Sequence, residues 1–247
     1  MPMSPKPYGL PWGMRNRDPG APSLAAVPGP QDPSALGSPW PFKAAAGILA
    51  APAIDYAGHL YVTTEAGLLH RVQPTGEGTE IYDAGSPVRT SPALVLGSSG
   101  TGNEGEPPGI GAVYLGDDAG FLHCVQGDGT LLWTLSPGIG QDAQGVPLRS
   151  DPVVHRAAGS SRSRIFVGCD DGRLFAVSET TAAAAATDWE YSVLAPLRTS
   201  PVLSADGMSV HLATADGFLH TLDALSGQLR HSPVKLSGTQ LHTPALD

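Results

Sequence analysis

The stretch Ala66-Gly67-Leu68-Leu69-His70 decides the fold, because close variants of it recur three more times along the chain. The variants are Ala119-Gly120-Phe121-Leu122-His123, Asp171-Gly172-Arg173-Leu174-Phe175 and Asp216-Gly217-Phe218-Leu219-His220. Their glycines are 53, 52 and 45 residues apart. Self-similarity at a nearly fixed period indicates a repeat architecture. The chain of 247 residues is therefore predicted to be a repeat protein.

A second motif keeps step with the first and begins each unit with a proline-led apolar run. The prolines of this run are Pro52, Pro92, Pro152, Pro201 and Pro244. A second apolar run, the glycine hairpin, an alternating run and a glycine turn follow, so each unit predicts four short strands. The Asp-Gly pairs at 171–172 and 216–217 favour two-residue hairpin turns. The alanine-rich stretch 182–186 is too short to form a helix alone. The prediction is an all-β fold of β-propeller blades.

Two longer stretches carry a family resemblance. They are Gly168-Cys169-Asp170-Asp171-Gly172-Arg173-Leu174-Phe175-Ala176-Val177-Ser178 and Thr221-Leu222-Asp223-Ala224-Leu225-Ser226-Gly227-Gln228-Leu229-Arg230-His231. Together they resemble one blade of the pyrroloquinoline-quinone-type propellers, which include quinoprotein dehydrogenases and the outer-membrane-assembly propeller lipoprotein. The chain is most similar to the non-enzymatic members of that family.

The resemblance covers most of residues 38–247 and implies a quinoprotein-like β-propeller there. Family blades end on a tryptophan, and Trp133 and Trp189 fit that position. Tyr82 is predicted to replace the tryptophan in the first unit, and His231 stands there in the last. Residues 1–37, rich in Pro and Gly, are predicted to form a separate N-terminal segment.

The strand count predicts four complete blades and parts of another. Ser38-Pro39-Trp40-Pro41-Phe42-Lys43 resembles an outermost strand with no blade ahead of it. Leu241-His242-Thr243-Pro244-Ala245-Leu246-Asp247 resembles the innermost strand of a fifth blade. An innermost strand without outer neighbours leaves backbone groups unpaired. We therefore expect a fragment of a seven- or eight-bladed propeller. The alternative is a half-propeller that associates with another chain.

Composition and charge argue against several classes of partner. Lys and Arg number 14 against 23 Asp and Glu, for a formal net charge of −9. This argues against nucleic acid, since that binding needs clustered Lys and Arg. No apolar stretch is long enough to cross a bilayer. The first seven residues lack the apolar core of a secretion signal. We therefore expect a cytoplasmic location, or a periplasmic or extracellular one if a signal peptide has been removed.

Features of catalysis are sparse in the sequence. Quinoprotein dehydrogenases hold their quinone with a calcium ion, acidic and amide ligands, a tryptophan floor and often a disulfide between adjacent cysteines. The only cysteines, Cys124 and Cys169, are far apart and are expected to be buried free thiols. No set of calcium ligands can be matched to the family's. His70, His123 and His220 recur at one repeat position, and a structural role is favoured over a metal site because equivalent positions diverge from the axis. No cofactor and no metal are therefore predicted.

Three arginines form the candidate binding site. Arg89, Arg149 and Arg198 each lie three residues before a blade proline, where the innermost strands approach one another around a channel mouth. Three guanidinium groups there could receive a carboxylate or a phosphate. The alternative is that each arginine pairs with an acid of a neighbouring blade, Asp151 being one candidate. The outer units have Leu49 and Leu241 in this slot.

The predicted function is a non-catalytic interaction scaffold whose partners are other proteins. One alternative is a quinone-dependent oxidoreductase-like propeller whose catalytic parts lie in further blades. Another is a sensor of anionic small molecules or sugars that uses the three arginines. The low-complexity segments 97–109, 157–164 and 180–187 join strands at the same end of their blades, so they are predicted to share one face.

Overall fold

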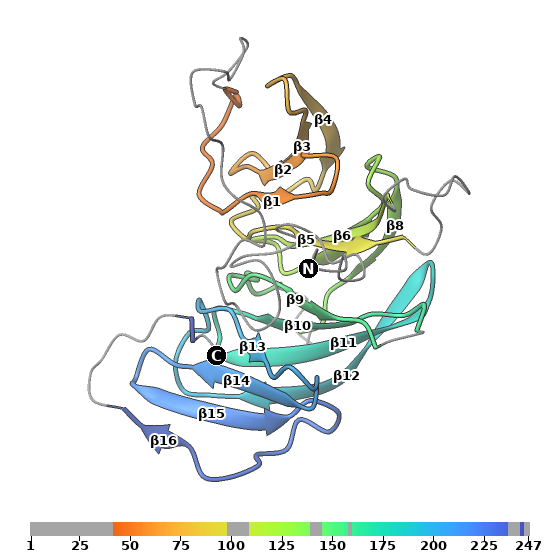
Figure 1. The fold of residues 1–247 in the computed structure, drawn as a ribbon. Helices are drawn as coiled ribbons and strands as arrows, with labels where there is room; N and C mark the ends of the chain where they lie inside the picture. The colour runs from red at the N-terminus through yellow and green to blue at the C-terminus, as the bar shows by residue number, and fades with distance from the viewer. Residues whose placement is uncertain (1–41, 98–108, 139–144, 158–159, 237–242, 245–247) are drawn as a thin grey trace, which may run out of the picture.

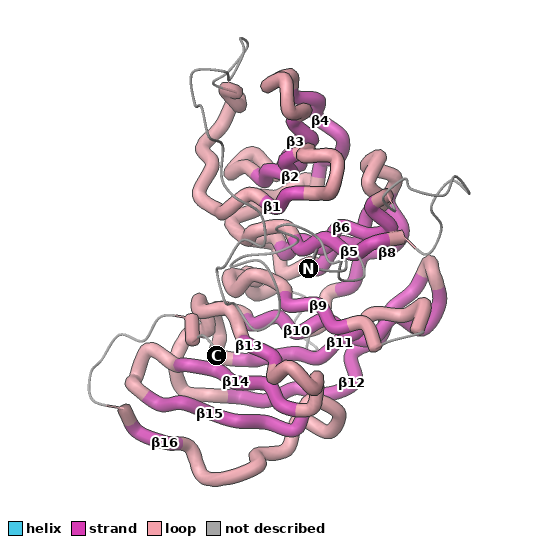
Figure 2. The backbone as a smooth tube through the Cα atoms, in the orientation of Figure 1, coloured by secondary structure: helices cyan, strands magenta, loops and turns pink. Residues whose placement is uncertain are grey.

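The computed structural model describes residues 42–97, 109–138, 145–157, 160–236 and 243–244. These residues form four antiparallel sheets of four strands each and contain no helix (Figures 1 and 2). The predicted all-β fold with blade-like units is confirmed. Residues 1–41, which hold the predicted N-terminal segment and most of the predicted outermost strand, lie outside the described part.

Each sheet uses four consecutive strands in chain order, as expected of a propeller blade. Blade 1 contains β1 (Ala53–Ile54), β2 (Leu60–Thr63), β3 (Leu68–Val72) and β4 (Gly78–Asp83). Blade 2 contains β5 (Ala93–Leu96), β6 (Ile110–Gly116), β7 (Leu122–Val125) and β8 (Leu131–Leu135). Blade 3 contains β9 (Val153–His155), β10 (Arg164–Gly168), β11 (Arg173–Thr181) and β12 (Ala184–Ser192). Blade 4 contains β13 (Val202–Leu203), β14 (Ser209–Ala213), β15 (Phe218–Asp223) and β16 (Val234–Lys235).

The hydrophobic core lies between blades. Figure 1 shows the blades succeeding one another from blade 1 at the top to blade 4 at the bottom, and β9 contacts both β5 and β13. Three clusters of buried side chains fill the three junctions, one between each pair of successive blades. Tyr61 and Val113 meet in the first, Tyr114 and Phe175 in the second. Each blade therefore depends on its neighbours for burial of its apolar faces.

The recurring glycines close the turns between the second and third strands. Gly67, Gly120, Gly172 and Gly217 have φ of 88°, 86°, 89° and 87°. In blade 4 the carbonyl of Thr214 accepts the Gly217 N–H, and the Thr214 N–H donates to the carbonyl of Phe218. The loop thus has three residues, and the prediction of two-residue turns is wrong. The Thr214 hydroxyl also accepts the Phe218 N–H at 3.3 Å, and the glycine that ends the loop has the positive φ.

A chain of hydrogen bonds joins successive blades beside the innermost strands. The donor is the backbone N–H of the residue that precedes a blade proline. The acceptor is the side chain of the residue at the same position in the next unit. Ala51 donates to Ser91 at 3.1 Å, Ser91 to Asp151 at 2.6 Å, and Asp151 to Ser200 at 3.3 Å. Ser200 donates to Thr243 at 3.2 Å. The fifth unit therefore begins beside blade 4, as the predicted strand of that unit requires.

The strand connections define two faces of the molecule. The mouth face carries the turn between the second and third strands of each blade and the connection into the next blade. The loop face carries the other two turns of each blade. Of the low-complexity segments, the described parts of 157–164 and 180–187 lie on the loop face, as predicted, whereas 98–108 lies outside the described residues. The alanine stretch 182–186 lies mostly in β12, which pairs with β11 in the longest hairpin.

The structure also tests the predictions made for Tyr82 and for the two cysteines. Tyr82 lies opposite Leu69, as Tyr191 lies opposite Leu174, whereas Trp189 lies opposite Ala176. Tyr82 is therefore the counterpart of Tyr191, and the prediction that it replaces the blade tryptophan is wrong. The expected free thiols are confirmed, since both cysteines are unpaired and buried. Burial raises the pKa of each to about 12, so the thiols stay protonated.

Candidate functional site

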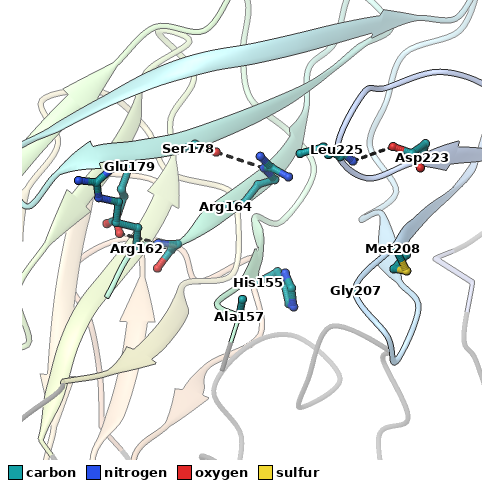
Figure 3. Close-up of a pocket in the computed structure, with 11 residues that line it drawn as sticks. His155, Ala157, Arg162, Arg164, Ser178, Glu179, Gly207, Met208, Asp223 and Leu225 are labelled. Atoms are coloured by element: carbon teal, nitrogen blue, oxygen red, sulfur yellow. Dashed lines mark hydrogen bonds between the residues drawn. The ribbon is translucent and has the colours of Figure 1, made fainter. Parts of the chain in front are cut away.

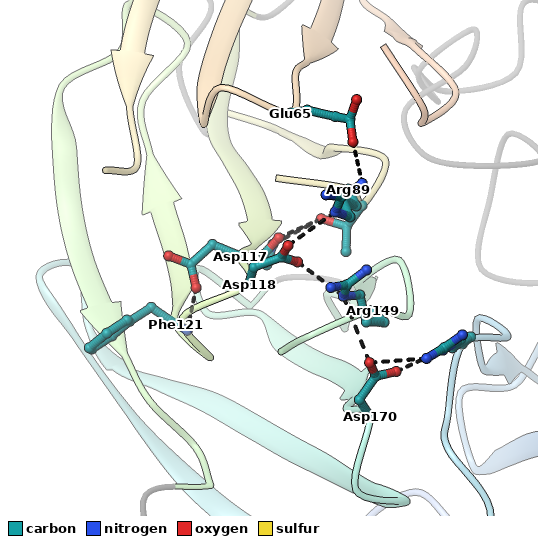
Figure 4. A network of polar contacts seen from close by, with 10 residues as sticks. Glu65, Arg89, Asp117, Asp118, Phe121, Arg149 and Asp170 are labelled. Carbon is teal, nitrogen blue, oxygen red and sulfur yellow. Dashed lines mark hydrogen bonds and ion pairs between the residues drawn. The ribbon is translucent and has the colours of Figure 1, made fainter. Parts of the chain in front are cut away.

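The predicted arginines lie together on the mouth face, where each connection leads into an innermost strand, and Figure 4 labels Arg89 and Arg149. Facing them are acids that follow the second strands of the blades, namely Glu65, Asp118 and Asp170. The turn places each acid beside the connection to the next blade. The repeat therefore brings an acid of one blade to an arginine of the next.

Acids and arginines alternate across three junctions. Arg89 forms ion pairs with Glu65 and, through Nε at 3.0 Å, with Asp118 Oδ2. Arg149 Nε lies 3.0 Å from Asp118 Oδ1 and 3.9 Å from Asp170 Oδ2. We call the row of alternating acids and arginines the charge ladder; its members are Glu65, Arg89, Asp118, Arg149, Asp170 and Arg198. A carboxylate between two guanidinium groups holds both in place.

The ladder ends at Arg198 in blade 4. Arg198 Nε donates to Asp170 Oδ1 at 2.9 Å, and its side chain is 69% exposed. The next acid position along the repeat is Ala215, which offers no carboxylate. The hydrogen bonds to Asp118 and Asp170 raise the pKa of Arg89 and Arg198 respectively. Three positive charges thus face three negative ones.

The geometry of the mouth face matches the alternative in which each arginine pairs with a neighbouring blade. Asp151 is buried and accepts hydrogen bonds from the Ser91 N–H and the Ser200 hydroxyl. Leu49, which takes the arginine slot in the first unit, is 62% exposed. Leu241 lies outside the described residues. Binding of an anion by Arg89, Arg149 and Arg198 stays a prediction.

Two of the recurring histidines bridge blades by hydrogen bonds near the mouth face. The Tyr82 hydroxyl and His123 Nδ1 are 2.9 Å apart, and Tyr191 and His220 form the same pair at 2.9 Å. His123 Nε2 also lies 3.2 Å from Asp117 Oδ2. Burial lowers the pKa of His220 and raises the pKa of Tyr82 and Tyr191. These contacts fasten neighbouring blades to each other.

At the other two places where this histidine position recurs, the side chain makes apolar or aromatic contacts instead of a hydrogen bond to a tyrosine. At the junction of blades 2 and 3, Phe175 replaces the histidine and Leu135 replaces the tyrosine, and both belong to one cluster. His70 of blade 1 lies against the ring of Phe42, with centroids 5.5 Å apart. Among the residues that the structure places, no group of three or more His, Cys, Asp or Glu is arranged to hold a metal ion.

The loop face has a pocket at every blade junction. The pocket between blades 1 and 2 measures about 340 Å³, that between blades 2 and 3 about 450 Å³, and that between blades 3 and 4 about 490 Å³. Figure 3 shows the third, with His155 and Arg164 on one side and Met208 and Asp223 on the other. Loop and turn residues supply more of the pocket walls than the strands do.

Three arginines that line pockets of the loop face without an ion pair were not identified from the sequence, and neither was a fourth, Arg164, which pairs with Asp188 at 3.0 Å. Arg71 lines the first pocket, Arg156 the second, and Arg162 both the second and the third. None of the three forms an ion pair with another residue of the described ranges. These arginines do not recur at one repeat position, so no periodic signal marks them.

Comparison with solved structures establishes the fold. BamB from Moraxella catarrhalis is similar with a TM-score of 0.54 and 18% sequence identity, over 80% of this chain and 56% of that one. Quinohemoprotein alcohol dehydrogenase from Comamonas testosteroni is similar with a TM-score of 0.56 and 14% identity, over 79% of this chain and 36% of that one. The fold is that of the pyrroloquinoline-quinone-type propellers.

The chain spans about half of the first of these proteins and about a third of the second. The sequence matches no protein-family model and no curated protein. No helix of the described residues is long and apolar enough to cross a membrane.

Proposed function

We propose that this chain is a non-catalytic interaction scaffold that binds another protein on its loop face. The observation that supports this most directly is the contrast in how arginines are used. On the mouth face, the arginines of the charge ladder form ion pairs with acids of the described residues. On the loop face Arg71, Arg156 and Arg162 line pockets, and their guanidinium groups have no carboxylate partner among the described residues.

Two exposed apolar side chains lie beside a pocket of the same face. Met208 and Leu225 are 59% and 70% exposed and line the pocket between blades 3 and 4. Apolar groups beside a pocket and next to charged groups are typical of protein interfaces. The similarity of the fold to BamB, and of the blade motifs to the outer-membrane-assembly lipoprotein, also favours a scaffold.

Site-specific photocrosslinking tests the proposal. A photoreactive amino acid replaces Met208 on the loop face or, as a matched control, Leu194, which is fully exposed on the connection between blades 3 and 4 on the mouth face. We expect a discrete protein adduct in cells from position 208 and none from position 194. Equal adducts from both positions, or adducts from 194 alone, would contradict a loop-face scaffold.

An oxidoreductase is the second candidate, because the fold also resembles a quinohemoprotein alcohol dehydrogenase. It predicts quinone-dependent dye reduction when pyrroloquinoline quinone and calcium are added to the full-length protein. The sensor alternative predicts that Arg149→Ala weakens binding of an anionic ligand. The alternating charges of the ladder weigh against it, because they leave little positive charge for a ligand.

The location of the protein remains a proposal as well. The similarity to the propeller lipoprotein of outer-membrane assembly favours a periplasmic location over the cytoplasmic one. Fractionation of cells that express the full-length protein, with a cytoplasmic and a periplasmic marker, decides between them.

A further inference from the structure

The pocket between blades 2 and 3 on the loop face stands out by its charge. Its walls carry Arg156 and Arg162 against the single acid Glu179, an excess of one positive charge. The pocket between blades 3 and 4 has two arginines against two acids. The pocket between blades 1 and 2 has one arginine against two acids. On a chain with a net charge of −9, this is the pocket suited to a negative ligand.

The two guanidinium groups of this pocket keep donors available. Arg156 is held by hydrogen bonds from Nε and Nη2 to the Ser163 hydroxyl, at 3.3 and 3.2 Å, and from Nη1 to the Leu96 carbonyl at 2.8 Å. These bonds use three of its five N–H groups. The Arg162 guanidinium forms no hydrogen bond to any other described residue. One arginine is thus fixed and the other is exposed beside it.

The acid of the pocket is already bonded within the core. Glu179 is buried, its Oε1 accepts the Tyr114 hydroxyl at 2.6 Å, and its Oε2 accepts the Ser163 N–H at 2.8 Å. Cys124 Sγ lies 3.9 Å from the same Oε1. These donors compensate the carboxylate from the side of the protein, so its charge opposes a ligand at the mouth of the pocket less than a free carboxylate would.

Arg162 also connects this pocket to the next one. Arg162 and Glu179 line both the second and the third pocket, which makes the two pockets neighbours across blade 3. The far pocket ends at the exposed side chains of Met208 and Leu225. Two adjoining pockets, one positive and one with an apolar end, fit an extended chain better than a single ion.

From this arrangement we infer that Arg156 and Arg162 bind an acidic side chain of a partner peptide in extended conformation. An apolar side chain of the same peptide then lies against Met208 and Leu225. The inference rests on the proposed scaffold function and names the chemistry that its loop face recognises. Arginine suits this task because its planar donors match a carboxylate.

Fluorescence anisotropy with the full-length protein tests the inference. The probes are fluorescein-labelled serine-rich decapeptides with one glutamate and one leucine, separated by two to five serines. We expect binding by at least one spacing, and Arg162→Gln to weaken it about tenfold or more. Replacing the probe's glutamate by glutamine should weaken binding by the wild type similarly, and the two changes should not add. Arg198→Gln, an exposed arginine of the mouth face, should leave binding unchanged.

Three results would overturn the inference. The first is equal affinity for the glutamate and glutamine probes, and the second is an equal loss with Arg198→Gln. The third is complete displacement of the peptide probe by inorganic phosphate at constant ionic strength. That result would assign the pocket to a small anion. Glutamate-dependent probe binding without a protein adduct at position 208 would support the acidic-peptide site and contradict the proposed scaffold function. A protein adduct at position 208 without glutamate-dependent probe binding would support the scaffold function and contradict the acidic-peptide site.

Discussion

The two faces of this molecule differ in how completely their arginines are paired with acids. On the mouth face, Arg89 and Arg149 each lie between two carboxylates. On the loop face, Arg156 and Arg162 line a pocket without an ion pair to any residue that the structure places. Arginine therefore joins blades on the mouth face, whereas Arg156 and Arg162 on the loop face are available although Arg164 beside them is paired with Asp188. The arginines that recur with the repeat face acids that recur with it, whereas Arg156 and Arg162 have no such recurring partner.

The largest effect that sharpens this comparison concerns the turns of the mouth face. Gly120 has φ of 86°, and a Cβ there would lie 2.7 Å from the Val146 carbonyl oxygen. Gly120→Ala should lower the free energy of unfolding by about 2 to 4 kcal/mol, because the backbone strain and the collision add. Gly85, with φ of 74° and no atom within 4 Å of such a Cβ, is the matched control.

Urea denaturation measures both glycine variants. Gly85→Ala should cost only the strain of a positive φ, about 1 kcal/mol. If both variants cost the same, the close approach of Gly120 to the Val146 carbonyl does not affect stability.

The next effect concerns the charge ladder itself. Asp118 forms ion pairs with Arg89 and Arg149, and its side chain is only 16% exposed. Asp118→Asn leaves the two guanidinium groups facing each other and should lower the free energy of unfolding by about 1 to 2 kcal/mol. Arg198→Gln, at the exposed end, should cost less than about 0.5 kcal/mol.

Arg162→Gln, on the loop face, serves as the control for the ladder variants in the same urea denaturation. It should leave the midpoint unchanged, since surface substitutions away from any partner rarely affect stability. A loss of stability with Arg162→Gln as large as that with Asp118→Asn would mean that both faces use arginine structurally.

The smallest effect concerns how the pH changes stability through the Tyr191–His220 contact between blades 3 and 4. Burial lowers the pKa of His220, so the folded state binds its proton less readily than the unfolded chain does. The stability that His220 contributes is therefore complete above about pH 6.5 and is lost as the pH falls through its folded pKa. The variant Tyr191→Leu with His220→Phe copies the Leu135 and Phe175 pair of the neighbouring junction.

This double variant should unfold within about 1.5 kcal/mol of the wild type at pH 7.5, since packed volume is nearly kept. Between pH 7.5 and 5 it should lose less stability than the wild type, because one buried neutral histidine is gone. His70 and His211, whose pKa values burial also lowers, retain part of the dependence. An unchanged pH profile of the urea midpoint would show that His220 does not contribute.

Most of the blade architecture could be predicted from local patterns. The glycines of the recurring motif require a positive φ, and the apolar runs around them have strand periodicity. The turn length could not be predicted, because an Asp-Gly pair fits more than one turn and does not reveal which backbone groups close the loop, as those of Thr214 and Phe218 do. The role of Tyr82 was also missed, since a one-residue shift in β4 register decides which residue it faces.

Of the candidate site, the sequence by itself determined that Arg89, Arg149 and Arg198 gather at one end of the blades, because their spacing follows the repeat. Only the tertiary structure decided what they face, since Arg89 and Asp118 are joined across a junction between two blades. The grouping of Arg156 and Arg162 with Glu179 was likewise decided by packing, because loops outside the repeat carry no periodic signal of their contacts. Repetition is a local property that sequence records, whereas the meeting of side chains between blades depends on how the blades pack.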